Sequence, residues 1–117
     1  MSSRKDLIKE YKQKKFNAGV FQIRNTVNGK VYIDHSVNLD AIYNRHRTEL
    51  NFGSHRNQRL QKDWKEFGEA GFVFEVLSEL KQEDDGLQDV PKELKQLEAM
   101  FLEELAPYGD KGYHQEK

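Results

Sequence analysis

The stretch that decides the fold spans residues 19–33 and reads GVFQIRNTVNGKVYI. Two runs rich in β-branched and aromatic residues flank Asn28-Gly29, the dipeptide that best accepts the positive φ values of a tight primed turn. The stretch therefore predicts a β-hairpin with strands near residues 18–24 and 30–33. The remaining elements are expected to pack around this hairpin.

The same turn sets which side chains share a face of the sheet. Because side chains alternate along a strand, Val31 and Ile33 face one side and Tyr32 faces the other. A tyrosine hydroxyl is therefore predicted to stand apart from the aliphatic side chains next to it in the sequence.

Length and composition predict one soluble domain. The chain has 117 residues, of which 33% are charged, so it buries a single modest core. We divide it into a basic N-terminal helix at residues 1–16 and a globular domain at residues 17–117. It contains no cysteine, which excludes disulfides, thiol nucleophiles and thiolate metal sites. It also has no run of about 18 apolar residues and no apolar signal region, so we expect a cytoplasmic protein without a membrane partner.

Charge is distributed unevenly along the chain. Residues 1–62 contain 13 Lys and Arg against 5 Asp and Glu, a charge of +8, whereas residues 63–117 contain 6 against 15, a charge of −9. A basic half of this size is typical of a protein that binds a polyanion. Self-complementary surface charge explains the same pattern, so both interpretations stand at this point.

Hydrophobic periodicity predicts four helices and one further strand. The helices span residues 3–15, 38–50, 55–67 and 91–105, and the strand spans residues 72–77. The acidic, polar segment at residues 81–90 is predicted to be a surface loop.

The helix after the hairpin carries a histidine in its apolar stripe. Ser36 or Asn38 is its expected cap, and His46 lies among the apolar residues, with Arg45 and Arg47 on either side. The last helix likewise places Glu98 among its apolar residues. Such a carboxylate is either a structural group paired with Arg, Lys or a tyrosine hydroxyl, or a cation ligand or acid–base group at the edge of the core. Periodicity alone favours the paired carboxylate.

Several short motifs follow one another with a characteristic spacing. The first two are Gly19-Val20-Phe21 and VYID at residues 31–34. The others are NTVNGK at residues 25–30, GSH at 53–55, LQ at 60–61 with Trp64, FEVL at 74–77 and GYH at 112–114. In this order they resemble the GIY-YIG nuclease family, in which Gly-Ile-Tyr and Tyr-Ile-Gly stand at the first two places.

The resemblance implies a fold, an activity and a cofactor. The fold is a small α/β (α+β) domain with a three-stranded antiparallel sheet flanked by helices. Members of the family cut DNA phosphodiesters with one divalent cation, so Mg²⁺ or Mn²⁺ is the implied cofactor. By position, Glu98 is the implied metal ligand, Tyr32 the general base or water-orienting group, and His46 a further catalytic residue. A lone domain of this size is expected to bind DNA with little sequence preference.

Four positions depart from the family pattern. Phe21 lacks the hydroxyl of the first-motif tyrosine. Asp34 replaces a glycine, where it either adds a second oxygen ligand or, if unpaired, raises the pKa of the neighbouring carboxylate by repulsion. Ile42 replaces the catalytic arginine, and His114 replaces an asparagine near the end of the chain. Losing a bidentate arginine lowers rates by orders of magnitude, so we expect weak cleavage or none. Arg45, three residues after Ile42, is the candidate for a replacement guanidinium.

The sequence thus predicts a degenerate GIY-YIG endonuclease domain that retains DNA association. The alternatives are a non-catalytic nucleic-acid-binding domain and a protein-interaction module that uses the acidic segment. For DNA binding, the expected phosphate contacts are basic residues of the first half of the chain. They are Arg24, Arg45, Arg47, His55, Arg56, Arg59 and Lys62.

Overall fold

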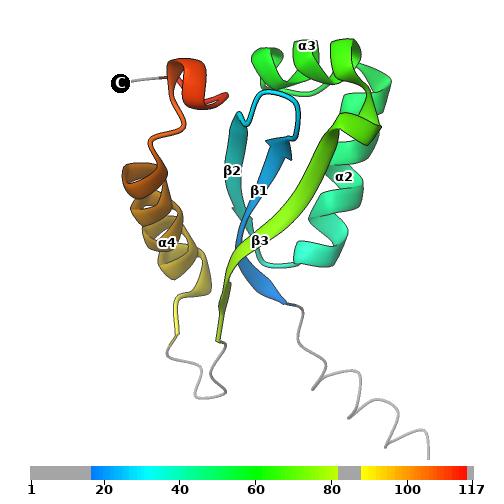
Figure 1. The fold of residues 1–117 in the computed structure, drawn as a ribbon. Helices are drawn as coiled ribbons and strands as arrows, with labels where there is room; N and C mark the ends of the chain where they lie inside the picture. The colour runs from blue at the N-terminus through cyan, green and yellow to red at the C-terminus, as the bar shows by residue number, and fades with distance from the viewer. Residues whose placement is uncertain (1–16, 82–87, 116–117) are drawn as a thin grey trace, which may run out of the picture.

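The computed structural model describes residues 17–81 and 88–115, which form one sheet with helices on both faces (Figure 1). The three strands are β1 (Ala18–Asn25), β2 (Val31–Ser36) and β3 (Phe72–Leu80). They are antiparallel in the order β2-β1-β3, which leaves β2 at an edge. The predicted three-stranded antiparallel sheet and fold class are confirmed.

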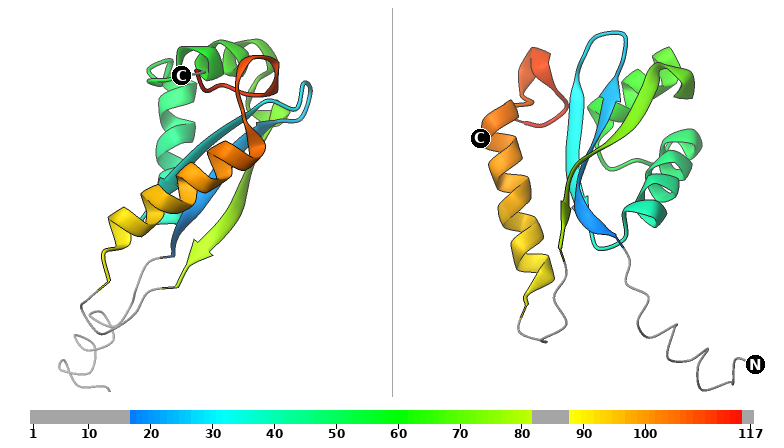
Figure 2. Two further views of the ribbon diagram at one scale, coloured as in Figure 1. Left: turned by 90° about the vertical axis from the view of Figure 1, so that its left-hand side faces the viewer. Right: turned by 60° about the horizontal axis from the view of Figure 1, so that its bottom comes forward.

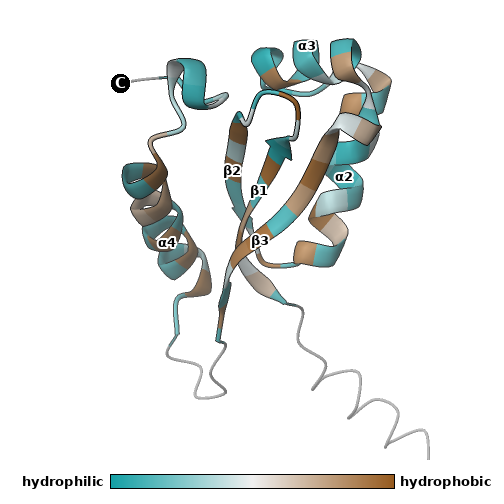
Figure 3. Cartoon of the chain, in the orientation of Figure 1, coloured by the Kyte–Doolittle hydropathy of each residue, from teal (hydrophilic) through white to brown (hydrophobic). Residues whose placement is uncertain are grey.

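Three helices pack on this sheet. α2 (Leu39–Phe52) and α3 (Gln58–Phe67) lie on one side, and α4 (Val90–Leu105) lies on the other (Figure 2). Short 3-10 turns at Glu69–Gly71 and Gly109–Lys111 precede β3 and the C-terminal segment. The helices carry both apolar and polar bands, as expected of elements that cover a sheet (Figure 3). None of the described helices has the length and apolar character needed to cross a lipid bilayer.

The face of the sheet toward α2 and α3 holds the main hydrophobic core. Phe21, Ile23 and Tyr32 from the strands join Leu60 and Trp64 from α3 in one cluster, and each is at most 6% exposed. Burying a large apolar side chain contributes about 1.5–3 kcal/mol, so this cluster holds the two helices against the hairpin.

The side chains of β2 alternate between the two faces of the sheet, as predicted. Tyr32 is paired with Ile23, and Asp34 with Phe21, so all four side chains belong to the core face. Ile33, between them, is 1% exposed and belongs to the face that α4 covers. Tyr32 and Asp34 are therefore neighbours on one face of an edge strand.

The hairpin turn differs from the predicted tight primed turn. The strands end at Asn25 and restart at Val31, so five residues connect them, and Gly29 alone among these has a positive φ, at 78°. The reason is the buried side chain of Asn25, whose Oδ1 accepts the backbone N–H of Val27 at 2.8 Å. Its carbonyl oxygen accepts the N–H of Gly29 at 2.8 Å. An asparagine that bonds to the backbone two residues later builds a wider turn.

The N-terminus of each of two helices is capped by an asparagine side chain. Asn38 caps α2 by accepting the backbone N–H of Ala41, as one of the two predicted caps. α3 begins at Gln58 and not at His55, because the side chain of Asn57 is the N-cap. His55 therefore belongs to the irregular segment before the helix.

Some predictions fall outside the described residues. One is the N-terminal helix at residues 3–15, together with the boundary between the helical segment 1–16 and the domain 17–117. The other is most of the acidic loop. They stay predictions.

Candidate active site

The site lies at the edge strand β2, between the elements on the two faces of the sheet. β2 supplies Tyr32, Asp34 and His35, α2 supplies His46, and α4 supplies Glu98. Tyr32, His46 and Glu98 come from separate parts of the sequence, and the fold brings these three predicted residues to one edge.

Tyr32 is enclosed by rings. The rings of His46 and His55 stand edge-on to it at 5.7 and 5.5 Å, and the ring of His114 stacks on it at 5.2 Å. Its hydroxyl accepts a hydrogen bond of 3.1 Å from Nη2 of Arg56. Burial raises the pKa of this hydroxyl, so it is protonated at neutral pH. In this state it can orient a water or phosphate oxygen, but it does not remove a proton.

His46 and His55 form a buried hydrogen-bonded pair. Nδ1 of His46 lies 2.8 Å from Nε2 of His55, and Nδ1 of His55 accepts the backbone N–H of Asn57 at 3.0 Å. Because a backbone amide only donates, we infer that neutral His55 carries its proton on Nε2 and donates it to His46. Burial, aided by the neighbouring His46, lowers the pKa of His55 to about 4, which keeps it neutral at pH 7.

This pairing makes His46 a hydrogen-bond donor. With Nδ1 accepting from His55, the proton of neutral His46 is on Nε2, which lies 3.7 Å from Oδ2 of Asp34. Nε2 is buried and has no hydrogen-bond partner among the described residues. The N–H is therefore available to an oxygen at the site, whereas proton abstraction by this imidazole would require another tautomer.

Asp34 and Arg56 form an ion pair next to the tyrosine. Nη2 of Arg56 lies 2.8 Å from Oδ2 of Asp34. Burial acts to raise the pKa of Asp34, but nearby His46, the backbone N–H of His35 and the charge of Arg56 outweigh it and lower the pKa to about 2. Asp34 is therefore ionised at neutral pH. The Arg56 side chain is 71% exposed, so it is accessible to a phosphate group.

Glu98 reaches the same edge from α4. Its Oε1 lies 3.2 Å from Nδ1 of His35, and its side chain is 22% exposed. Burial raises the pKa of Glu98, His35 opposes that rise and Asp34 adds to it. The carboxylate points inward, as the helical periodicity predicted. Its neighbour is a histidine, and not one of the partners expected from the sequence.

The donor atoms fit a divalent cation. Asp34, His35 and Glu98 each offer one ligand atom, and these three atoms lie within 4.8 Å of one another. Carboxylate oxygens suit Mg²⁺ and Mn²⁺, and an imidazole nitrogen suits transition metals. A divalent cation would also balance the two carboxylate charges.

Two of the replaced family positions leave gaps in the chemistry of the site. Phe21 is fully buried, and its ring packs against those of His46 at 5.5 Å and Phe74 at 4.8 Å, so no hydroxyl enters from this position. Ile42 lines a pocket of about 100 Å³ that Asp34 and His46 also line, and it contributes no charge there.

Arg56, and not Arg45, supplies the guanidinium closest to the tyrosine. Arg45 is paired with Glu49 one turn later, Nε to Oε1 at 3.1 Å, and its side chain is 74% exposed. Both arginines line the pocket beside Ile42, but Arg56 is hydrogen-bonded to Tyr32. The geometry therefore favours Arg56 as the phosphate-binding group.

His114 ties the C-terminal segment to β2. Its Nε2 accepts the backbone N–H of Ile33 at 2.8 Å, and the backbone N–H of Tyr113 donates to the carbonyl of Val31 at 3.0 Å. Burial lowers the pKa of His114, which favours the neutral acceptor form. A ring nitrogen here accepts the bond that an amide oxygen would accept, and the ring covers Tyr32.

Three residues predicted to contact DNA are engaged elsewhere. Arg24 lies on the face opposite Tyr32 and pairs with Glu75, Nε to Oε1 at 2.7 Å. The guanidinium of Arg47 lies over the ring of Tyr43 at 5.8 Å. His55 is 5% exposed with both ring nitrogens bonded, so its predicted DNA contact is corrected to a role in positioning His46.

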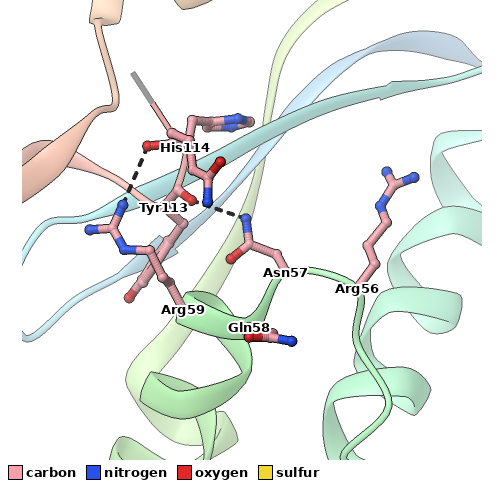
Figure 4. A pocket seen from close by; sticks show the side chains of 7 residues that line it. Arg56, Asn57, Gln58, Arg59, Tyr113 and His114 are labelled. Atoms are coloured by element: carbon pink, nitrogen blue, oxygen red, sulfur yellow. Dashed lines mark hydrogen bonds between the residues drawn. The ribbon is translucent and has the colours of Figure 1, made fainter. Parts of the chain in front are cut away.

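Two of the remaining basic residues border a groove at the start of α3 (Figure 4). Arg56 and Arg59 line this groove of about 560 Å³, and Nη2 of Arg59 donates to the carbonyl of Gly109 at 2.7 Å. Lys62 lines a smaller hollow of about 160 Å³ with Lys30, Arg59 and the acidic Asp63. Because Arg59 borders both, the two hollows adjoin and form a basic surface that begins at the site.

Two site residues were missed from the sequence. His35 had no assigned role, although a histidine directly after a motif position at the end of a strand is a signal for metal binding. Arg56 was expected only to contact DNA, and its position in an irregular segment beside His55 was the available signal.

The fold matches that of the GIY-YIG endonuclease catalytic domain, as two solved structures show. A substituted form of the catalytic domain of intron endonuclease I-TevI is similar with a TM-score of 0.71 and 25% identity, covering 85% of this chain and 93% of that domain. A second structure, of the catalytic domain of homing endonuclease I-TevI, has a TM-score of 0.69 and 27% identity, covering 86% of this chain and 99% of that one.

A curated relative agrees with the structural comparison. Intron-associated endonuclease 1 of Enterobacteria phage T4 is 36% identical over 70 residues. The match covers 58% of this chain and 27% of the relative, so the chain spans about a quarter of that protein. No protein-family model matches the chain. The resemblance to GIY-YIG domains that the motifs predicted is confirmed, and these similar proteins are endonucleases.

Proposed function

We propose that this chain is a metal-dependent DNA endonuclease domain of the GIY-YIG type that associates with DNA and cleaves it slowly. The observation that carries the proposal is the convergence of Tyr32, His46 and Glu98 at one edge of the sheet, beside the exposed guanidinium of Arg56. The similar I-TevI domain and phage T4 protein, both named as endonucleases, support the reaction class.

A divalent cation, Mg²⁺ or Mn²⁺, belongs to the proposal. Glu98 would hold it, with Asp34 and His35 within reach. When bound, the cation supplies charge neutralisation at the phosphate and the leaving oxygen and lowers the pKa of water. The carboxylates of Glu98 and Asp34 would supply the negative charge that attracts the cation.

The chain's own groups bind and orient the phosphodiester. Arg56 offers guanidinium N–H donors to non-bridging oxygens, and it is exposed enough to exchange Asp34 for a phosphate. The Nε2–H of His46 donates to an oxygen, and the hydroxyl of Tyr32 orients the attacking water. Preorganised donors of this kind stabilise charge that develops in the transition state.

Slow cleavage follows from the substituted positions. Phe21 removes one hydroxyl, and Ile42 removes one guanidinium from the pocket wall. Asp34 adds a negative charge that competes with the phosphate for Arg56. Each change weakens binding of the charge that forms on the phosphate, so we expect turnover well below that of a complete site.

DNA association depends on the basic surface beside α3. Arg56, Arg59 and Lys62 line adjoining hollows that start next to the tyrosine, which is where a strand entering the site would pass. Contacts of this kind bind the phosphate backbone, so we expect little sequence preference and affinity that falls with salt.

A non-catalytic DNA-binding module is the second candidate. It is favoured by the Asp34–Arg56 ion pair and by the contact of Glu98 with His35, because charged groups of the site already face partners within the domain. The two candidates share DNA binding and differ only in hydrolysis. The cytoplasmic location stays a prediction.

A plasmid assay separates the candidates. Purified protein is incubated with supercoiled plasmid and Mg²⁺ or Mn²⁺, beside Glu98→Gln and the matched control Glu103→Gln, an exposed carboxylate of the same helix. Nicking by the wild type and Glu103→Gln, but not by Glu98→Gln, supports the endonuclease. Salt-sensitive retention of duplex DNA without nicking supports the non-catalytic DNA-binding module. Absence of both nicking and DNA retention contradicts both candidates.

A further inference from the structure

We propose that Asp34 and His35 complete, with Glu98, a three-residue site that binds first-row transition-metal ions such as Mn²⁺ more tightly than Mg²⁺. The inference rests on the proposed function for a cation at Glu98. The inference adds Asp34 and His35 of β2 as ligands. It also adds a preference for transition-metal ions over Mg²⁺, because His35 offers a nitrogen donor.

The backbone turns the Asp34 carboxylate toward His35. Adjacent residues of a strand normally point to opposite faces, so their side chains diverge. Here Oδ1 of Asp34 accepts the backbone N–H of His35 at 2.8 Å, which bends the carboxylate along the strand. Oδ1 then lies 3.9 Å from Nδ1 of His35. Because β2 is an edge strand, no other strand in the described part of the chain lies beside these two residues.

The spacing of the donor atoms suits metal coordination. Nδ1 of His35 lies 3.2 Å from Oε1 of Glu98. Two ligands at about 2.0–2.2 Å from a metal and at right angles to each other are about 3 Å apart. Nδ1 of His35 is also buried without a well-formed hydrogen bond to any described residue. A buried nitrogen that faces two carboxylates but bonds neither well is positioned to bind a cation between them.

A second, independent group lies at the other oxygen of the Asp34 carboxylate. The His46 side chain is 6% exposed, and its Nε2 lies 3.7 Å from Oδ2 of Asp34 without a hydrogen-bond partner in the described part of the chain. A buried polar atom without a partner is costly unless a water or ligand satisfies it. A water or phosphate oxygen next to Asp34 would accept this N–H.

The donor set decides the metal preference. Mg²⁺ prefers oxygen ligands and keeps its waters, whereas imidazole nitrogen favours Mn²⁺, Co²⁺ and Zn²⁺ increasingly along the Irving–Williams order. Glu98 and Asp34 alone would serve Mg²⁺. His35 is the ligand that favours Mn²⁺ over Mg²⁺, so its removal should lower the affinity for Mn²⁺ far more than the affinity for Mg²⁺.

The test measures metal binding directly on the full chain. Titration calorimetry with MnCl₂ and MgCl₂ gives affinities, and the pulsed EPR spectrum of bound Mn²⁺ reports coupling to a ¹⁴N nucleus. Wild type is compared with His35→Ala, Asp34→Asn and Glu98→Gln, with Glu103→Gln as the control outside the cluster. Circular dichroism of each variant checks that it folds.

We expect Mn²⁺ to bind at least about tenfold more tightly than Mg²⁺ and to show ¹⁴N coupling. His35→Ala should abolish the coupling and lower Mn²⁺ affinity about tenfold or more, with a much smaller effect on Mg²⁺. Asp34→Asn should weaken both ions.

Other results would contradict either this metal site or the proposed hydrolysis, and the two can be told apart. Mn²⁺ bound without ¹⁴N coupling, or with affinity unchanged in folded His35→Ala, overturns this inference but leaves a cation at Glu98. Mn²⁺ bound as expected, with plasmid nicking equal in wild type and Glu98→Gln, overturns the proposed hydrolysis and leaves the metal site standing. No binding of either ion overturns the inference outright.

Discussion

Nδ1 of His46 and Nε2 of His55 lie 2.8 Å apart, edge-on to the ring of Tyr32. The backbone N–H of Asn57, bonded to the far nitrogen of His55, sets the tautomer of both rings. One main-chain donor before α3 thus determines which form of His46 faces the carboxylate of Asp34.

The histidine pair predicts loss of stability in mild acid. The pKa of His55 is about 4 in the folded protein and about 6.5 when unfolded, so the unfolded chain binds more protons between these values. Stability is therefore full above about pH 6.5 and falls as the pH drops toward 4, by at most about 3 kcal/mol. Urea unfolding at pH 7, 6, 5 and 4 measures this. His55→Gln should flatten the profile, and an unchanged slope in that variant would refute the assignment.

Glu98→Gln should abolish metal-dependent nicking without destabilising the fold. The pKa of Glu98 is raised in the folded protein, so folding disfavours its ionised form. A neutral amide of similar shape should leave the melting temperature unchanged or higher, while activity falls by about 100-fold or to background. Thermal unfolding and plasmid nicking are measured on the same preparations. A clearly lower melting temperature would instead identify Glu98 as a structural carboxylate.

Restoring a guanidinium at position 42 should increase cleavage. Ile42 lines the pocket next to Asp34 and His46 and is only partly buried, so a long side chain has room there. Ile42→Arg should raise the nicking rate about tenfold or more, because it adds a bidentate phosphate ligand. Ile42→Lys is the control, since it adds the charge without the planar fork. Equal rates for all three proteins would show that this position no longer limits the reaction.

Lys62→Ala should weaken DNA binding evenly across sequences. Its exposed ammonium lines the hollow beside Arg59, so its removal should lower the salt dependence of the binding constant by about one phosphate contact. Fluorescence anisotropy with two unrelated duplexes at four salt concentrations gives the slopes. Lys95→Ala, on the exposed side of α4, is the matched control and should leave the slope unchanged. Identical slopes in the two variants would place the DNA elsewhere.

Sequence patterns alone predicted most helices and strands of the described residues and the face on which several key side chains lie. Period-two alternation placed Tyr32 on the face opposite Ile33, and helical periodicity turned His46 and Glu98 inward, because these patterns depend on local backbone geometry alone. The order of the motifs was enough to identify the GIY-YIG fold.

The chemistry of the site depends on how separate elements pack together. Asn25 widened the predicted tight turn through its own side chain, which accepts the N–H of Val27. Arg56 reaches Tyr32 from an irregular segment with no periodicity to read, and His35 meets Glu98 across 63 positions of sequence. Such contacts arise when separate elements pack together, and no local propensity encodes which polar groups then become neighbours.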